Sequence, residues 1–129
     1  MGGWMSMIEG AETMSFTGKS GGVAIKGLSE HELSTVMYLV GFPNLLVSLH
    51  PDYVMTHLMT PPLAADRTHV ECAWAFPKDV AAREDFDASY AVDFWDLTNR
   101  QDWAACESVQ RGLSSPHARP GPLAPDEDG

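Results

Sequence analysis

Regular alternation of apolar and polar side chains marks one segment of the chain as a β-strand. Between residues 68 and 76 every second position is apolar, and these positions are Val70, Cys72, Trp74 and Phe76. A period of two is typical of a strand in a sheet that buries one face. The pattern therefore predicts a half-buried strand whose apolar face needs a cover.

Two segments that precede this strand also have the composition of strands. Residues 44–50 and 53–60 are rich in aliphatic and aromatic side chains, and Pro51-Asp52 and residues 61–66 separate the segments. Pro and Asp at these positions favour turns. We therefore predict three consecutive antiparallel strands.

The N-terminal part of the chain predicts an edge strand and then a short helix. Apolar residues within 2–16 indicate one or two edge strands broken by Gly10, and residues 18–27 form a loop rich in Gly, Ser and Lys. Ser29 and Glu32 have the spacing of a capping box. The apolar positions that follow are Leu33, Val36, Met37 and Val40. We predict a short amphipathic helix over these positions.

The longest remaining run without Pro or Gly, residues 87–111, predicts a helix that ends at Gly112. Spacings of three, four or seven place the following residues on one stripe of this helix: Trp95, Thr98, Asp102, Ala105, Cys106, Val109 and Leu113. The opposite side carries the acid-to-base pairs Asp96 with Arg100 and Glu107 with Arg111. The stripe is expected to face a sheet, which predicts an α+β fold with a long C-terminal helix over an antiparallel sheet.

Asp102 is the one charged residue of the predicted inward-facing stripe. An unpaired carboxylate is costly to bury, so such a group is normally hydrogen-bonded, neutralised by a base, protonated or bound to a metal. Periodicity alone favours an Asp that is bonded to a backbone amide, a Trp N–H or an Arg. A functional carboxylate is the alternative that periodicity leaves open.

Charge and cysteine content narrow the classes of partner. The net charge of -10, from 18 acidic and 8 basic side chains, repels phosphate backbones and anionic membranes, so we expect neither nucleic acid nor membrane as a partner. Cys72 and Cys106 are too few and too far apart for a disulfide framework, which favours a cytoplasmic protein. No apolar stretch approaches the roughly 18 residues of a membrane span.

The C-terminal residues differ in composition from the rest of the chain. From Ser114 onward the sequence is rich in Pro, Gly and acidic residues and has no apolar periodicity. Such a composition is typical of chain without a core to pack against. We expect residues 1–113 to be a partial domain and residues 114–129 to be an extended tail.

Residues 94–115 resemble the C-terminal helix of the α-subunits of Rieske non-haem iron oxygenases. The specific part of the resemblance is a Q-D-W-x-x-C-E pattern, which begins at Gln101 and ends at Glu107. Further matches are Gly-Ala-Glu-Thr-Met at 10–14, Phe-Pro-Asn-Leu-Leu at 42–46, Leu-His-Pro-Asp-Tyr-Val at 49–54 and Arg-Pro-Gly-Pro-Leu at 119–123. The similarity is closest to the branch with choline and carnitine monooxygenase-like proteins.

The resemblance implies a fold, a metal and a role for one residue. Members of the family have a helix-grip catalytic domain, also described as START-like or SRPBCC-like, in which two His and one carboxylate hold a mononuclear Fe(II). The Asp of the helix pattern is that carboxylate, so the resemblance assigns Asp102 as catalytic residue and metal ligand. It also implies that Asn44, Trp95 and Thr98 line the substrate pocket.

Several motifs of the family have no counterpart in this chain. A Rieske [2Fe-2S] cluster needs paired C-x-H and C-x-x-H loops, and neither Cys72 nor Cys106 has a His at either spacing. The two iron-binding His of the family lie upstream of the matched region. None of the five His of this chain is expected to replace them; these are His31, His50, His57, His69 and His117. We therefore expect a fragment with one iron ligand, whose full-length relative holds the [2Fe-2S] cluster.

The resemblance favours one function, and the residues leave two alternatives. By family, the full-length protein would hydroxylate or demethylate a small aromatic or quaternary-amine substrate with O₂, with electrons from a reductase or ferredoxin, as a homo-oligomer such as a trimer. The fragment alone is expected to be inactive. A helix on a curved sheet could instead bind an apolar small molecule without chemistry. The chain could also be the product of a decayed gene.

Overall fold

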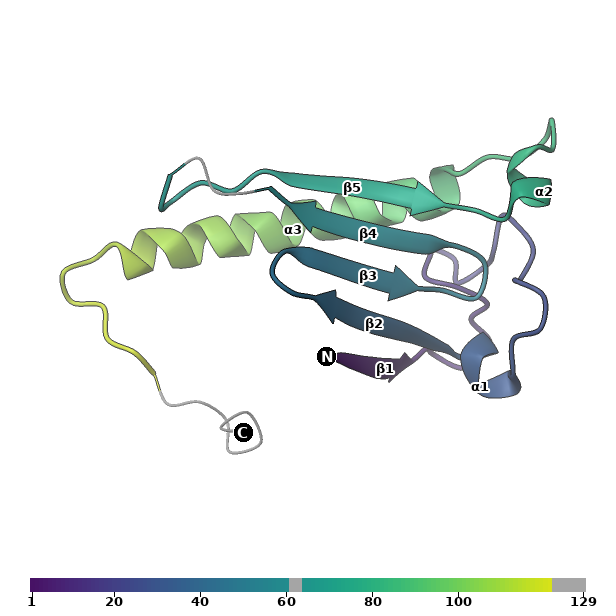
Figure 1. Ribbon diagram of the computed structural model, residues 1–129, viewed down its shortest axis with the longest axis horizontal. Helices are drawn as coiled ribbons and strands as arrows, with labels where there is room; N and C mark the ends of the chain where they lie inside the picture. The colour runs from purple at the N-terminus through teal and green to yellow at the C-terminus, as the bar shows by residue number, and fades with distance from the viewer. Residues whose placement is uncertain (61–63, 122–129) are drawn as a thin grey trace. The chain divides into compact units, whose positions relative to one another are not determined.

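The computed structural model describes residues 1–60 and 64–121. The chain divides into two compact units, Met1–Leu97 and Thr98–Gly129. The N-terminal unit contains a five-stranded antiparallel sheet in the order β1-β2-β3-β4-β5 (Figure 1). Its strands are β1 (Gly2–Ser6), β2 (Thr35–Gly41), β3 (Leu45–Leu49), β4 (Val54–Met59) and β5 (Val70–Ala75). Sheet and helices together agree with the predicted α+β class.

The three strands predicted between residues 44 and 76 are confirmed as β3, β4 and β5. In β5, half-buried and exposed residues alternate along the whole strand, as the period of two predicts. Trp74 of β5 lies opposite Met55 of β4, which in turn lies opposite Ser48 of β3. The predicted edge strand is also present, because β1 pairs with β2 alone among the described strands.

The predicted helix after Ser29 is only partly correct. Its capping box is present, since Ser29 and Glu32 bond to each other's backbone amides. The helix α1 (Glu30–Leu33) nevertheless stops after one turn, and Val36 and Val40 belong to β2. β-branched residues fit a pleated sheet better than a helix, and β2 pairs with strands on both sides. The apolar spacing of these residues fits both a helix and a strand. Pairing of β2 with its neighbouring strands therefore decides that they form a strand.

Two further helices follow the sheet in sequence. They are α2 (Lys78–Ala81) and α3 (Ser89–Leu113). The prediction that Gly112 ends the second of these helices is wrong by one residue, because Gly112 lies inside α3. Gly112 does not have the positive φ of a glycine that stops a helix. Instead, the amide of Ser114 still bonds to the carbonyl of Gln110 at 3.0 Å.

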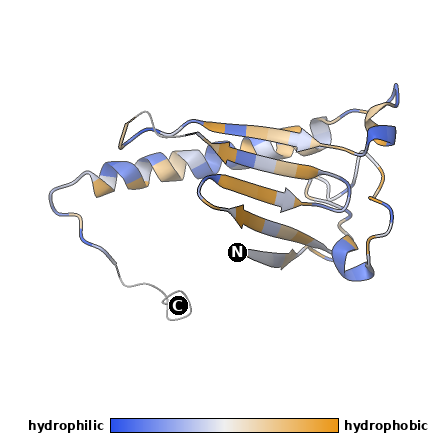
Figure 2. Ribbon diagram, in the orientation of Figure 1, coloured by the Kyte–Doolittle hydropathy of each residue, from blue (hydrophilic) through white to orange (hydrophobic). Residues whose placement is uncertain are grey.

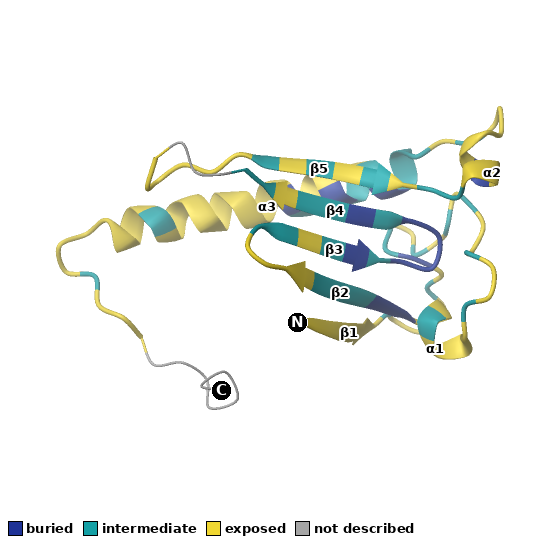
Figure 3. Ribbon diagram, viewed as in Figure 1, coloured by how far each residue is buried: buried dark blue, intermediate teal, exposed yellow. Residues whose placement is uncertain are grey.

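The core of the N-terminal unit lies where the first turns of α3 meet β4 and β5. Tyr53, Met55, Ala91 and Trp95 are buried there. Partly buried residues surround them, namely Tyr38, Cys72, Trp74, Phe76, Tyr90 and Phe94. Figure 2 shows the apolar residues concentrated in the strands, and Figure 3 shows the dark, buried segments at one end of β2, β3 and β4.

The predicted tail is described only up to residue 121. Residues 114–121 contain neither helix nor strand, and residues 122–129 of the tail lie outside the described residues. The predicted turn at 61–66 is likewise described only from residue 64 onward. Within the described part of the chain, no helix has both the length and the apolar character that crossing a bilayer requires.

Candidate functional site

Asp102 lies in the second half of α3, and its surroundings differ from those predicted. The periodicity predicts a buried stripe, but Asp102, Ala105 and Cys106 are all exposed. Figure 3 shows the second half of α3 mostly in yellow, the colour of exposed residues. The described residues of the C-terminal unit, 98–121, contain one helical segment and coil, so no second layer covers this segment within the unit. The prediction of a buried Asp102 is therefore wrong, whereas its role as a metal ligand stays a prediction.

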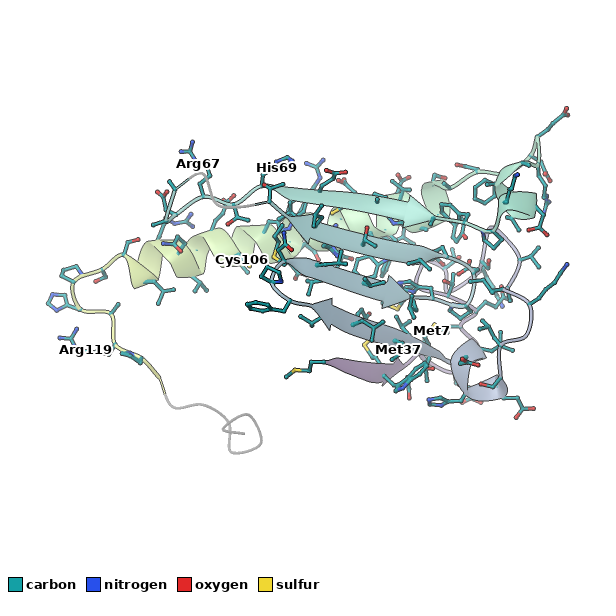
Figure 4. The ribbon with its side chains drawn as sticks, in the orientation of Figure 1. Met7, Met37, Arg67, His69, Cys106 and Arg119 are labelled. Carbon is teal, nitrogen blue, oxygen red and sulfur yellow. The ribbon has the colours of Figure 1, made fainter. Side chains whose placement is uncertain are left out.

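The histidines do not gather around a candidate metal site. His50 is buried after β3 and His57 is half-buried in β4, whereas His31, His69 and His117 are exposed. Figure 4 labels His69, just before β5, and Cys106 on α3. Among the residues that the structure describes, no group of three or more His, Cys, Asp or Glu side chains could hold a metal ion. The described residues therefore do not bring two further ligands together with Asp102.

A buried polar cluster is built around the carboxylate of Asp52, which is only 2% exposed. The hydroxyl of Thr13 donates a hydrogen bond to Oδ1 over 2.6 Å. The hydroxyls of Ser20 and Tyr90 donate to Oδ2 over 2.5 and 2.7 Å. Hydrogen bonds to the ionised form offset the cost of burying a carboxylate. Three hydroxyls thus stabilise Asp52 where a cation is the more usual partner of a buried acid.

The next residue, Tyr53, connects the loop after β1 with α3, as Asp52 does. Its hydroxyl donates to the carbonyl of Met14 over 2.9 Å and accepts the indole N–H of Trp95 over 2.8 Å. Burial raises the pKa of the Tyr53 hydroxyl above its ordinary value. Burial and the Asp52 carboxylate both raise the pKa of Tyr90. Both phenols therefore stay protonated at neutral pH and serve as donors.

His50 lies beside Tyr53 and is only 3% exposed. Its ring stacks on Tyr53 with 4.1 Å between centroids and meets the edge of Trp95 at 5.7 Å. Neither ring nitrogen has a hydrogen-bond partner among the described residues. Burial lowers the pKa of His50 to about 3, so the imidazole is neutral under physiological conditions. The His50 side chain therefore contributes packing and carries no charge.

Two of the predicted pocket residues, Asn44 and Trp95, have different surroundings. The side-chain amide of Asn44 donates to the carbonyl of Met59 over 2.7 Å, and the Asn44 carbonyl accepts the Met59 amide, so Asn44 ties the β2–β3 turn to the end of β4. Trp95 is buried and uses its N–H on Tyr53. Thr98 is half-buried on α3. Asn44 and Trp95 hydrogen-bond to different partners, and their shared role in a pocket stays a prediction.

The polar cluster around Asp52 and Tyr53 was not predicted from the sequence. Pro51-Asp52 has the composition of a turn, and a turn is normally exposed. The partners of Asp52 are 39, 32 and 38 residues away in sequence, beyond the reach of any local pattern. The one available signal is that an acid stands between a Pro and a Tyr at the start of an apolar strand.

Comparison with known proteins gives a family match over the whole chain. The family model described as ring hydroxylating alpha subunit (catalytic domain) matches residues 1–129. The glycine betaine monooxygenase oxygenase subunits of two Pseudomonas aeruginosa strains, UCBPP-PA14 and PAO1, are each 28% identical over 120 residues. The match covers 93% of this chain and 28% of each relative, so the chain spans little more than a quarter of their length.

Proposed function

Because the chain belongs to the ring hydroxylating alpha subunit (catalytic domain) family, we propose that it is part of the iron-binding catalytic domain of a Rieske-type oxygenase. The family and its relatives make it an oxidoreductase by descent. The match over residues 1–129 is the observation that carries the proposal. The helix-grip arrangement, residues 1–113 as the partial domain and residues 114–129 as its tail belong to the same proposal.

In this proposal Asp102 supplies the carboxylate of a site with two His and one carboxylate. Such a site fixes one face of a non-haem iron and leaves positions where O₂ can bind beside substrate. The described residues do not complete the site, because no group of three ligands occurs among them. In this proposal the chain contributes one ligand and is expected to be inactive alone. A [2Fe-2S] cluster belongs to the full-length protein, since a Rieske cluster needs two His and two Cys in paired loops.

The proposed substrate is a small aromatic or quaternary-amine compound. The relatives are named for glycine betaine, which carries a quaternary ammonium group. Aromatic faces attract such cations, and Trp95 is the aromatic member of the proposed pocket with Asn44 and Thr98. The proposed partners are O₂, a reductase or ferredoxin and further copies of the oxygenase subunit, and the proposed location is the cytoplasm.

A chimeric oxygenase tests this function. This chain replaces the aligned 120 residues of the P. aeruginosa PAO1 relative, and glycine betaine-dependent O₂ uptake is measured with the matching reductase. The proposal expects uptake above that of the relative with the segment deleted, and its loss in the Asp102→Asn variant. Asp93→Asn is the matched control, because Asp93 is an exposed acid on the same helix. A folded chimera whose uptake is indifferent to Asp102 would contradict the proposal.

A second candidate function rests on an apolar hollow of about 560 Å³ beside β1, β2 and β3. Its lining includes Trp4, Met37 and Leu39, which suits an apolar small molecule. Binding without chemistry predicts that a fluorescent apolar probe saturates at one site and that Met37→Glu abolishes this binding. Saturable binding that persists in the Met37→Glu variant would exclude the hollow as the site.

A further inference from the structure

The strand β1 leaves one edge of the sheet open. It pairs with β2 alone among the described strands, and all five of its residues are exposed (Figure 3). The amide of Val40 bonds to the carbonyl of Met1 over 2.8 Å, and the amide of Met7 bonds to the carbonyl of Ser34 over 3.0 Å. Because bonded and non-bonded positions alternate in an antiparallel pair, the odd-numbered residues of this segment are the ones that bond to β2.

The even-numbered residues of β1 therefore form a row of backbone groups on the open edge. Gly2, Trp4 and Ser6 direct their N–H and C=O groups away from β2. The register of β1 with β2 is continuous from Gly2 to Ser6, so no bulge interrupts this row. A row of this kind is complementary to one chemical class of partner, which is another extended main chain.

The open edge lacks the residues that usually protect an edge strand. Natural edge strands avoid unwanted pairing by means of Pro, charged side chains or a bulge. Residues 1–8 contain neither Pro nor a charged side chain. The strand at the other end of the sheet, β5, contains Glu71 and is followed by Lys78 and Asp79. The β1 edge is therefore the one suited to pairing.

The distribution of charge favours a second copy of this chain as the partner. The net charge of -10 makes two copies repel each other in general. The strands β1, β2 and β3 are an exception, because none of them contains a charged residue. On β1 itself, the side chains of Trp4 and Met5 are 49% and 40% exposed. Contact between two copies at β1 thus brings uncharged apolar side chains together.

We propose that β1 is a self-association surface, on which the β1 strands of two copies pair antiparallel and join the two sheets into one. A strand that pairs antiparallel with its own copy satisfies a two-fold axis, so the contact is the same on both sides. With Trp4 opposite Trp4 of the second copy, Gly2 lies opposite Ser6, and the backbone groups of all three residues are paired. The inference concerns the chain itself and depends neither on iron nor on oxygenase activity.

The same register brings the two Trp4 side chains together. Residues directly opposite each other in an antiparallel pair share one face of the sheet. Trp4 lines the apolar hollow beside β1, β2 and β3, so the two indoles meet at the border of this hollow. Aromatic pairs across strands stabilise a sheet, whereas like charges at such positions destabilise it. Trp4 is therefore the side chain with which to test the contact.

Sedimentation velocity at a series of concentrations measures the association. We expect a monomer that converts to a species of twice the mass as the concentration rises, without larger species. Trp4→Glu should raise the dissociation constant about tenfold or more, because two carboxylates would lie opposite each other. Val23→Glu is the matched control, since it adds the same charge at an exposed apolar residue outside β1, and it should dimerise like the parent chain.

A second pair of variants tests the main chain of the edge. The amide of Ser6 points away from β2, so Ser6→Pro removes a donor from the open edge and leaves the pairing with β2 in place. Ser6→Ala keeps the amide and is the control. Ser6→Pro should weaken the dimer while Ser6→Ala should not. Far-ultraviolet circular dichroism confirms that each variant is folded, and Trp4→Glu decides the question if Ser6→Pro does not fold.

Amide hydrogen exchange, followed residue by residue by nuclear magnetic resonance, locates the contact. The amides of Trp4 and Ser6 should exchange more slowly as the concentration rises, whereas those of Gly3 and Met5, which already bond to β2, should change little. A parent chain that stays monomeric would overturn the proposal. So would a dimer that persists unchanged in both Trp4→Glu and Ser6→Pro, or assemblies that grow beyond two copies.

Discussion

Asp52 and His50 show how two buried polar residues are accommodated in different ways. The carboxylate of Asp52 accepts hydrogen bonds from three hydroxyls, which offset the cost of its burial. His50 loses its charge because neither ring nitrogen meets a partner among the described residues and burial disfavours the imidazolium. The first group contributes hydrogen bonds to the fold, and the second contributes ring stacking on Tyr53.

The bond from Tyr90 to Asp52 predicts a measurable loss of stability when the hydroxyl is removed. Tyr90→Phe should lower the free energy of unfolding by about 1.5–3 kcal/mol, the usual range for a hydrogen bond to a charged group. Urea denaturation gives the value. Tyr38→Phe is the control, since Tyr38 is a half-buried phenol on β2, and a similar loss there would show that Tyr90 contributes no special bond.

The lowered pKa of His50 predicts a pH dependence with a definite sign. The unfolded chain takes up a proton at His50 below about pH 6.5, while the folded chain does so only near pH 3. Stability is therefore fully present above pH 6.5 and falls as pH decreases towards 3, by at most about 1.4 kcal/mol per pH unit. Carboxylates with lowered pKa, such as Glu12 and Asp87, add a loss of the same sign only at lower pH.

Replacement of His50 isolates its share of this dependence. His50→Leu should flatten the slope of unfolding free energy between pH 6.5 and 5, measured by urea denaturation at several pH values. His31→Leu should retain the slope, because His31 is exposed. Parallel slopes in the parent chain and in His50→Leu would show that His50 is not buried in its neutral form.

At the scale of elements, local sequence patterns predicted the strands well and the first helix poorly. The alternation in β5 follows directly from side-chain direction in a strand, and it is confirmed residue by residue. The Ser29 capping box correctly placed the start of α1. Its end could not be predicted, because Val36 and Val40 fit a helical stripe and a strand equally well, and pairing of β2 with β1 and β3 decides between them.

The contact between the loop and α3 predicts different effects for two glycine substitutions. Gly21→Ala should destabilise the chain by about 1–3 kcal/mol, because its Cβ would overlap the Tyr90 ring and push the loop off the helix. Gly3→Ala should be neutral or slightly stabilising, since nothing lies within 4 Å of a Cβ there. Thermal unfolding of both variants provides the comparison, and equal midpoints would contradict a tight contact at Gly21.

At the scale of the whole molecule, the sequence predicted the family and one candidate residue but not the surroundings of the candidate site. The Q-D-W-x-x-C-E pattern around Asp102 led to the oxygenase family, and the match over residues 1–129 confirms it. The hydrogen bonds of Asp52 were beyond prediction, because they join residues more than 30 positions apart. Exposure of Asp102 was also missed, because a helical stripe indicates which residues share a side and not whether anything covers them.

The central claim is that Asp102 is an iron ligand, and metal analysis of the chimeric oxygenase tests it most directly. Iron per subunit is measured by inductively coupled plasma mass spectrometry in the parent chimera, in Asp102→Asn and in Asp93→Asn, after removal of loosely bound metal. The account predicts that Asp102→Asn loses the mononuclear iron while Asp93→Asn and the parent retain equal amounts. Equal iron in all three proteins would contradict the assignment of Asp102 as a ligand.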